Sequence, residues 1–155
     1  MEDLLPTPKK FTLVSGSAEG PSSLNAFDNA LLAAGIGNLN LLKVSSILPP
    51  GCEFVEKLDI PPGSLTPTAY GAALSTKKGE LISAAVGIGF SADSYGVIME
   101  FSGSCSSREA EAQVTAMVKA AFAERKVPLA KVMTKSVEHV VAENGCAFAA
   151  VALWY

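Results

Sequence analysis

The last ten residues of the chain, "CAFAAVALWY" at 146–155, limit its fold more than any other segment. They carry no charge, and they are too few to cross the ~30 Å hydrocarbon layer of a membrane as a helix. We therefore predict a buried strand. Asn144-Gly145 stands directly before it, and this dipeptide is the strongest short-range signal for a β-hairpin turn. The sequence thus predicts that the segment 131–155 forms a hairpin.

Two helices are predicted from apolar residues that recur at helical spacing. Ser22 or Ser23 caps the first helix and Gly35 ends it, and its apolar residues are Leu24, Phe27, Leu31 and Ala34. The second helix spans 106–125, where Ser106 and Glu109 have the spacing of a capping box. Its predicted apolar face consists of Val114, Met117, Val118, Ala121 and Phe122.

Further strands are predicted from short apolar runs bounded by turn residues. They cover residues 11–15, 68–75, 80–90 and 96–101, with a tight turn at Lys77-Lys78-Gly79. The run "LNLLKVSSIL" at 39–48 is apolar enough for a central strand. Two helices and about six mostly antiparallel strands indicate an α+β layered fold. Without a repeat or a linker, the 155 residues are expected to form a single domain, 1–155.

Composition narrows the function classes. Hydrophobic residues make up 49% of the chain and charged residues 17%, which favours a folded protein and indicates an oligomer. The net charge of −3 offers no basic surface for a phosphate backbone, so we expect no nucleic acid partner. The start, "MEDLLPTPKKF", lacks the basic and continuously apolar segments of a secretory signal. We expect a cytoplasmic protein that does not enter a membrane.

Ordinary catalytic and metal-binding patterns are missing from the sequence. Cys52, Cys105 and Cys146 have no CxxC spacing, which argues against a disulfide framework or a zinc site, and no HExxH motif is present. The single histidine, His139, has no Asp or Ser near it in sequence, so we expect a structural or surface role. The glycines match no nucleotide-binding motif. We therefore expect no metal and no nucleotide cofactor.

The serine pair Ser45-Ser46 stands between an apolar run and the break Pro49-Pro50. A serine hydroxyl can attack the preceding carbonyl and convert the peptide bond to an ester, if the fold holds the strain. Loss of Ser45 as a carboxylate would leave dehydroalanine at position 46, which hydrolyses to ammonia and an N-terminal pyruvoyl group. An ordinary loop is the plain alternative for such a pair.

The segments "GSAEGPSSLNAFDNALLAAGIGNLNLLKVSSILPPG", "PTAYG", "GVIMEFSG" and "VEHVVAENGCAFAAVALWY" strongly resemble the pyruvoyl-dependent arginine decarboxylases. The resemblance covers residues 11–155 and is most specific in "NLNLLKVSSILPP". It implies cleavage between Ser45 and Ser46 into a β chain, 1–45, and an α chain, 46–155. It also implies a four-layer αββα sandwich, assembled as trimers with active sites between neighbouring subunits.

The activity implied by the resemblance is the conversion of L-arginine to agmatine and carbon dioxide through a Schiff base. The cofactor would be a covalent pyruvoyl group made from Ser46. Glu100, in "IMEF", matches the catalytic acid of the family. A Glu inside an apolar strand should have its pKa raised by desolvation, which keeps it able to donate a proton. A paired surface Glu on an edge strand is the alternative for this residue.

The resemblance assigns binding and processing roles to further residues. Asp28 matches the acid that holds the guanidinium, although a solvated helix residue is its plain alternative. Asn40 matches a residue that assists processing, and in this apolar run we expect it to be buried and hydrogen-bonded, or else to make only a backbone bond. Gly35, Gly37 and Leu39 are expected to line the substrate pocket through backbone groups, although a helix C-cap explains Gly35 equally well.

Two other functions stay open at this point. One is a pyruvoyl decarboxylase for a different amino acid, against which Asp28 argues by favouring a cationic substrate. The other is an unprocessed, non-catalytic subunit of the same fold, in which Ser45-Ser46 never cleaves.

Overall fold

The computed structural model describes residues 4–155, so the Met1–Asp3 start of the segment examined for a secretory signal lies outside it. It contains two helices and two sheets, whose elements are β1 (Lys10–Glu19), α1 (Ser23–Ala33), β2 (Asn40–Lys43), β3 (Ile47–Leu48), β4 (Glu53–Phe54), β5 (Leu65–Ser75), β6 (Leu81–Phe90), β7 (Gly96–Gly103), α2 (Ser107–Arg125), β8 (Lys131–Val140) and β9 (Gly145–Trp154).

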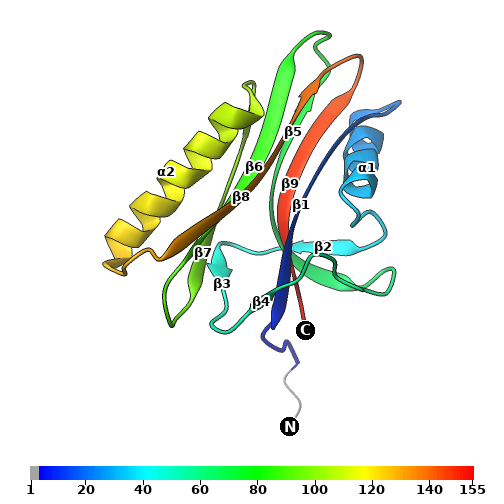
Figure 1. Ribbon diagram of the computed structural model, residues 1–155. Helices are drawn as coiled ribbons and strands as arrows, with labels where there is room; N and C mark the ends of the chain where they lie inside the picture. Colours follow the sequence, from blue (N-terminus) through cyan, green and yellow to red (C-terminus); the bar gives the residue numbers. More distant parts are fainter. Residues whose placement is uncertain (1–3) are drawn as a thin grey trace.

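The elements stack in four layers. A five-stranded sheet has the order β2-β5-β9-β1-β4, and a four-stranded sheet has the order β3-β7-β6-β8. Figure 1 shows the two sheets face to face between α1 on one outer side and α2 on the other. Neighbouring strands are mostly antiparallel, with β1–β4 and β2–β5 as the parallel pairs. This architecture confirms the expected α+β, αββα sandwich.

The main hydrophobic core lies between the two sheets. Both contribute fully buried side chains, including Phe11, Val86, Ile98 and Val151. Burying a side chain of this size stabilises the fold by roughly 1.5–3 kcal/mol. Smaller clusters lie outside the sheets, one beneath α1 around Phe148 and two beneath α2. Each helix is therefore held to its own sheet by a separate apolar contact.

Both predicted helices are present with their predicted ends. The Ser22 hydroxyl caps α1 by accepting from the Asn25 N–H, and Gly35 follows the helix with a φ of +85°. The Ser106 and Glu109 capping box starts α2. The predicted apolar face of α2 is buried except for Met117, which is 36% exposed. Including Met117 in that face was wrong.

The predicted C-terminal hairpin is wrong, because β8 and β9 belong to different sheets. β9 pairs with β1 on one side and with β5 on the other, so it has no free edge for β8. The connection between the sheets is fixed by Glu19, whose carboxylate accepts the N–H groups of Glu143 and Asn144. The Asn144 side chain also donates to the Gly20 carbonyl. Asn144-Gly145 thus lies in a turn that joins two layers.

Residues 4–155 contain nine strands where about six were expected, and β1 is longer than the predicted 11–15. The strand continues through Gly16 because α1 packs directly on its backbone there. A Cβ at Gly16 would lie 2.5 Å from the Ala30 oxygen and 2.6 Å from the Ala34 nitrogen. The glycine therefore serves a close approach of helix and strand, and it does not end the strand.

The run 39–48 is not a central strand as predicted. β2 is a four-residue strand at the edge of the five-stranded sheet, and it pairs only with β5. The chain then crosses to the other sheet, where β3 pairs with β7. Because the run is apolar along nearly its whole length, it resembled one buried strand. In the structure its apolar side chains are divided between two layers. Within residues 4–155, no helix is both long and apolar enough to span a membrane.

Candidate active site at the crossing between the sheets

Ser45 and Ser46 lie where the chain passes from one sheet to the other. Before them, the Val44 N–H donates to the Thr68 carbonyl of β5 at 3.1 Å. After them, the Ser46 carbonyl accepts from the Ile98 N–H of β7 at 2.7 Å. The Ser45–Ser46 peptide is thus held between hydrogen bonds to two different sheets.

The residues after Ser46 complete this anchor. Ile47 and Leu48 pair with Val97 and Gly96 of β7, and Leu48 is buried in the main core. The following turn closes through a hydrogen bond from the Cys52 N–H to the Pro49 carbonyl. The crossing therefore cannot slide along either sheet, which is the kind of surrounding structure that can hold a strained peptide.

Ser45 is exposed and Ser46 is half-buried. Within the part of the chain that the structure describes, neither hydroxyl forms a hydrogen bond to another side chain or to the backbone. The Ser46 hydroxyl is therefore not committed to a competing partner. Its neighbours Val44 and Ile98 both belong to the main apolar core or pack against it.

Glu100 lies on β7, two residues beyond the Ile98 that binds Ser46. Its side chain faces β5, because a Cβ on Gly71 would lie 3.4 Å from the Glu100 Cβ. Burial raises the pKa of Glu100, and the nearby Lys43 opposes part of that rise. The expected direction of the pKa shift is thus confirmed. The fold thus places a carboxyl group with a raised pKa on the strand that binds Ser46, two residues from that bond.

Lys43 and Tyr70 were missed by the sequence analysis. The Lys43 ammonium nitrogen lies 4.7 Å from the centroid of the Tyr70 ring. Lys43 is the last residue of β2 and stands two positions before Ser45. That proximity in sequence was the available signal, but the pairing of β2 with β5 decides that its side chain reaches Tyr70.

Asn40 is at the start of β2 and is exposed, so the prediction that it is buried was wrong. Its side-chain amide donates to the Gly63 carbonyl at 2.9 Å, and its backbone N–H donates to the Ser64 carbonyl. Because β2 is an edge strand, the Asn40 side chain lies at the surface, where its amide is satisfied by the hydrogen bond to the loop around Gly63. Within the chain, the Asn40 side chain contacts that loop and not the serine crossing.

Asp28 is exposed on α1. The neighbouring Phe27 packs inward against Tyr70 and Phe148, with ring centroids 6.2 and 5.9 Å apart. Asp28 thus belongs to the outermost layer, whereas Glu100 faces the opposite side of the five-stranded sheet. One chain alone does not bring Asp28 and Glu100 to one site.

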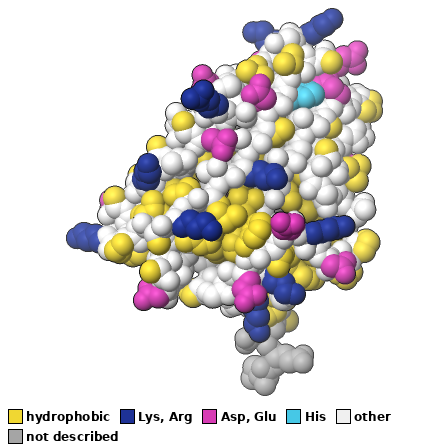
Figure 2. Space-filling view, viewed as in Figure 1, with side chains coloured by type: hydrophobic (Ala, Val, Ile, Leu, Met, Phe, Trp, Pro, Cys, Tyr) yellow, Lys and Arg dark blue, Asp and Glu magenta, His cyan; other side chains and the backbone are white. Residues whose placement is uncertain are grey.

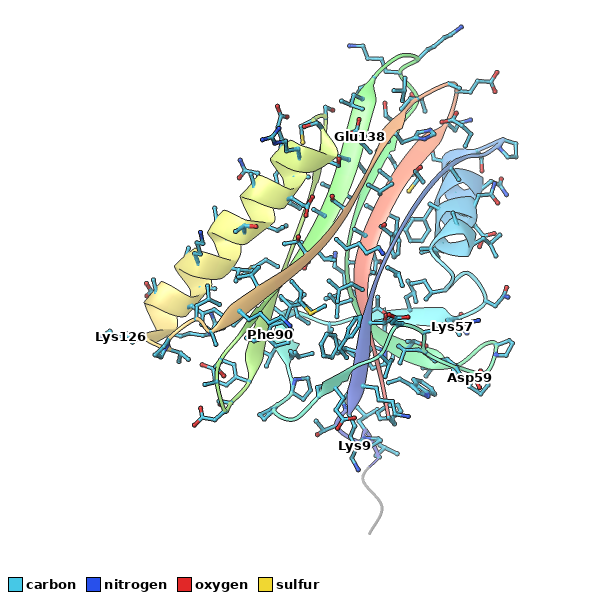
Figure 3. All side chains as sticks on the ribbon, viewed as in Figure 1. Lys9, Lys57, Asp59, Phe90, Lys126 and Glu138 are labelled. Atoms are coloured by element: carbon cyan, nitrogen blue, oxygen red, sulfur yellow. The ribbon has the colours of Figure 1, made fainter. Side chains whose placement is uncertain are left out.

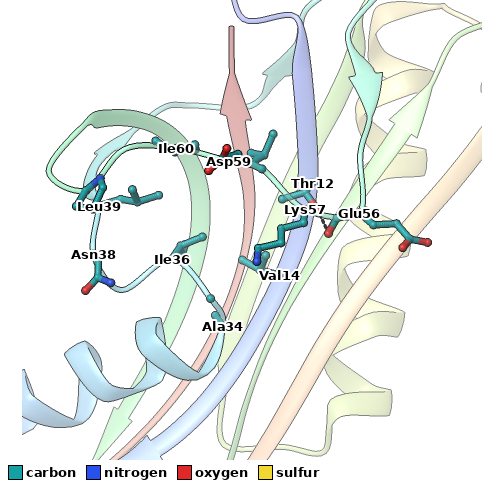
Figure 4. Close-up of a pocket in the computed structure, with 13 residues that line it drawn as sticks. Thr12, Val14, Ala34, Ile36, Asn38, Leu39, Glu56, Lys57, Asp59 and Ile60 are labelled. Carbon is teal, nitrogen blue, oxygen red and sulfur yellow. Dashed lines mark hydrogen bonds between the residues drawn. The ribbon is translucent and has the colours of Figure 1, made fainter.

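A pocket of about 430 Å³ lies beside the end of α1 (Figure 4). Gly35 and Leu39 are among its lining residues, but Gly37, Asp28 and Glu100 are not. The Gly37 position instead faces Leu32, whose side chain a Cβ would meet at 2.5 Å. The remaining lining residues are Thr12, Val14, Ala34, Ile36, Asn38, Glu56, Lys57, Leu58, Asp59, Ile60 and Pro62.

The charged residues near this pocket come from the segment after β4. Figure 4 shows Lys57 extending toward Val14, and Figure 3 shows Lys57 and Asp59 on the side of the molecule opposite Lys126 at the end of α2. On the face seen in Figure 2, acidic and basic side chains are interspersed around an apolar area. Two residues predicted to line the substrate pocket, Gly35 and Leu39, line this pocket. None of the catalytic candidates Ser46, Glu100 and Asn40 does.

His139 has a structural contact, since its Nε2 lies 2.5 Å from a carboxylate oxygen of Glu19. This hydrogen bond ties the end of β8 to the end of β1. The cysteines are free, and burial raises the pKa of Cys146 to about 11, which makes it an unreactive packed thiol.

Comparison with known proteins shows which family the chain resembles. Residues 10–155 match the family model described as pyruvoyl-dependent arginine decarboxylase. A protein of that name from Methanocaldococcus jannaschii is 50% identical over 150 residues, covering 96% of this chain and 91% of the relative. Those from Methanococcus aeolicus and Thermococcus kodakarensis are 48% and 43% identical, covering 96% of this chain and 91% and 96% of the relatives. The chain belongs to the pyruvoyl-dependent arginine decarboxylase family, a family of enzymes.

Proposed function

We propose that the chain cleaves itself between Ser45 and Ser46 and then decarboxylates L-arginine to agmatine. The observation that carries this proposal is the position of the serine pair, held between hydrogen bonds to β5 and β7 with Glu100 two residues beyond the second bond. The names of the family and of its relatives support arginine as the substrate. Two chains result, a β chain of residues 1–45 and an α chain of residues 46–155.

Processing begins when the Ser46 oxygen attacks the Ser45 carbonyl carbon. The peptide C–N bond breaks, and an ester joins Ser45 to the Ser46 side chain. β-Elimination then releases Ser45 as a carboxylate, and the dehydroalanine left at position 46 takes up water and loses ammonia. The product is a pyruvoyl group at the start of the α chain. Anchors on both sides support this step, because they prevent the crossing from relaxing as the ester forms.

The pyruvoyl group would supply a carbonyl for Schiff base formation with the α-amine of arginine and an electron sink for the pair that stays behind when carbon dioxide departs. Glu100 then donates its proton to the former α-carbon. Its half-buried position suits this task, because a raised pKa keeps a carboxyl group protonated closer to neutral pH. Val44 and Ile98 surround the reacting group with apolar atoms.

We assign the substrate guanidinium to Asp28 of a neighbouring subunit. A carboxylate accepts the two-pronged guanidinium well, and Asp28 is exposed on the outer layer of its own chain. The five-stranded sheet separates it from Glu100 in one chain, so a complete site requires a second copy. This need supports the proposed trimer. Exposed apolar side chains near the crossing also support it, with Leu42, Ile47 and Leu65 exposed by 44%, 41% and 60%.

The remaining assignments also depend on the assembly. Gly37 and Leu39, in the segment after α1, would present backbone groups to the substrate, and Leu39 lines the pocket beside that helix. Asn40 would assist processing from the edge of the sheet. Because its amide binds the Gly63 carbonyl in one chain, we place that assistance at the crossing of a neighbouring subunit.

Intact mass and product analysis test the proposal. Under denaturing conditions the purified protein should separate into two chains, the larger one with a blocked amino terminus, and it should form agmatine and carbon dioxide from arginine. Ser46→Ala removes the attacking hydroxyl and should leave one inactive 16.0 kDa chain. Ser94→Ala, in an exposed loop, is the matched control and should cleave normally.

Three results would overturn the proposed function. A wild-type chain that stays intact would be a non-catalytic subunit of the same fold. A cleaved enzyme that prefers lysine or ornithine to arginine would be a pyruvoyl decarboxylase for another amino acid. Cleavage and activity in Ser46→Ala would exclude a pyruvoyl group at that position.

A further inference from the structure

The chain that leads into the serine pair has few backbone contacts with β5. The pairing of β2 with β5 begins at Asn40 and ends at Lys43, which lies opposite Thr68. One more backbone bond follows, from the Val44 N–H to the Thr68 carbonyl at 3.1 Å. Ser45 comes next and is exposed. The contacts that fix Lys43 and Val44 therefore also fix the chain where it enters the serine pair.

The side chains of Lys43 and Val44 hold this stretch from opposite faces of the five-stranded sheet. Val44 packs against the main core between the two sheets. On the other face, the Lys43 ammonium nitrogen lies 4.7 Å from the centroid of the Tyr70 ring. A cation within about 6 Å of a ring centroid is attracted by the negative face of the ring. Within residues 4–155 Lys43 forms no ion pair, so the Tyr70 ring is the contact that places its ammonium.

The Tyr70 ring is itself held in place by α1 and β9. Its centroid lies 6.2 Å from that of Phe27 on α1 and 5.4 Å from that of Phe148 on β9. Phe148 is fully buried, and the other two rings pack against the same apolar cluster beneath α1. The ring thus offers Lys43 a fixed position that does not depend on the edge strand β2 itself.

We propose that Lys43 is a positioning residue for self-cleavage, because its ammonium, held over the Tyr70 ring, fixes the end of β2 two residues before Ser45. The inference rests on the proposed cleavage between Ser45 and Ser46. Attack of the Ser46 oxygen on the Ser45 carbonyl carbon requires both atoms to be held close together in one orientation, and small displacements slow such a step strongly. The Ile98 N–H fixes the far side of this peptide, and Lys43 adds a fixed point on the near side.

The rate of self-cleavage in freshly synthesised precursor tests this role. Cell-free synthesis followed over time on a denaturing gel gives the rate at which the 16.0 kDa chain becomes two chains. Lys43→Met keeps a long side chain and removes its charge, so cleavage should be about 2- to 5-fold slower, the range for losing one exposed cation–aromatic contact. Lys43→Arg keeps a cation and should cleave at the wild-type rate.

Lys131→Met is the matched control. Lys131 also lies over an aromatic ring, that of Phe90 at 5.8 Å, but on β8 of the other sheet, which does not pair with β3 or β7 at the serine crossing. This variant should cleave at the wild-type rate.

Substitutions at Tyr70 separate the contact from a general loss of stability. Tyr70→Phe keeps the ring and should cleave like wild type, whereas Tyr70→Leu removes the ring and should slow cleavage. Because the two residues act through one contact, Lys43→Met combined with Tyr70→Leu should cleave no more slowly than Tyr70→Leu alone. A double variant slowed by the product of the two single effects, or wild-type cleavage in Lys43→Met, would overturn the role of Lys43.

A second measurement separates this inference from the proposed function, because it does not need cleavage. In uncleaved Ser46→Ala protein, amide hydrogen exchange measured by NMR reports the bond from the Val44 N–H to the Thr68 carbonyl. Adding Lys43→Met should speed exchange at Val44 about 2- to 5-fold and leave exchange at Ile98 unchanged. Equal exchange at Val44 with and without Lys43→Met would overturn the inference.

The two failures are distinguishable. A wild-type chain that never cleaves, although Lys43→Met speeds exchange at Val44, would contradict the proposed function. The role of Lys43 in cleavage would fall with it, while the contact that holds the crossing would stand. A wild-type chain that cleaves and forms agmatine, with no effect of Lys43→Met on cleavage or on exchange, would overturn the role of Lys43 alone.

Discussion

The backbone N–H of Ile98 donates a 2.7 Å hydrogen bond to the carbonyl of Ser46, which joins the serine crossing to the strand that carries Glu100. Because strand residues rise about 3.3 Å each, Glu100 is only one pleat repeat along β7 from that bond. Ser46 and Glu100 are therefore connected through one strand. This relation links the proposed site of processing to the proposed proton donor.

The two chains made by cleavage should stay together in native conditions. The β chain contributes β1, which pairs with β9 of the α chain from Lys10 opposite Trp154 to Glu19 opposite Gly145. Cutting the crossing removes none of these hydrogen bonds. Native mass spectrometry should show both chains in one particle, and a denaturing gel should separate them. Separation of the chains in native buffer would contradict this prediction.

Glu100→Gln should still cleave but should lower kcat by about 10²-fold or more, the usual scale for removing a positioned general acid. The amide keeps the shape of the side chain and does not readily give up a proton. Steady-state kinetics on the cleaved protein measures the effect. Glu124→Gln, exposed on α2, is the control, and wild-type turnover in Glu100→Gln would move the acid role to another residue.

Asp28→Asn should weaken arginine use far more than self-cleavage, because the guanidinium it pairs with is not present during processing. Losing one partner of a desolvated charge pair costs about 2–5 kcal/mol. A loss of at least about 30-fold in kcat/KM is therefore expected, with cleaved chains still visible on a gel. Asp93→Asn, in an exposed loop, should behave like wild type. Near-normal kcat/KM in Asp28→Asn would remove Asp28 from the site.

Gly16→Ala should destabilise the contact between α1 and β1. The added Cβ would lie 2.5 Å from the Ala30 oxygen, and the helix must move to admit it. We expect the free energy of unfolding to fall by about 1–3 kcal/mol. Urea unfolding of uncleaved Ser46→Ala protein measures this change. Gly103→Ala is the control, since its Cβ would meet only Phe101 ring atoms at 3.5 Å, and equal stability of the two variants would argue against the close approach.

Glu19→Gln should destabilise the protein at neutral pH and have less effect in acid. Burial alone would raise the pKa of Glu19, but bonds from the Glu143 N–H and from His139 outweigh it and lower the pKa below its usual 4.5. A lowered pKa adds stability above the unfolded-state value, and that stability is lost as the pH falls through the folded-state value. Melting temperatures of uncleaved Glu19→Gln and its parent should therefore differ at pH 7 and converge as the pH falls below 4.5. A constant difference would mean that the charge of Glu19 does not stabilise the turn.

Features that depend on neighbouring residues could be predicted from the sequence. The capping box at Ser106 and Glu109, the N-cap at Ser22 or Ser23 and the end of α1 at Gly35 were all predicted, because each involves bonds within a few residues. The apolar surroundings of Glu100 on its strand were enough to predict the direction of its pKa shift. The serine pair and the segments around it were enough to indicate the family.

Tertiary structure decided which strands pair and which side chains meet. Asn144-Gly145 marks a turn, but whether β8 joins β9 depends on β9 being paired on both sides by β1 and β5. The division of the run 39–48 between two sheets likewise made Asn40 an exposed edge residue. Lys43 and Tyr70 are 27 positions apart, and only the pairing of β2 with β5 brings the ammonium over the ring. Such contacts follow from how the whole chain buries its apolar strands, a property that no local pattern carries.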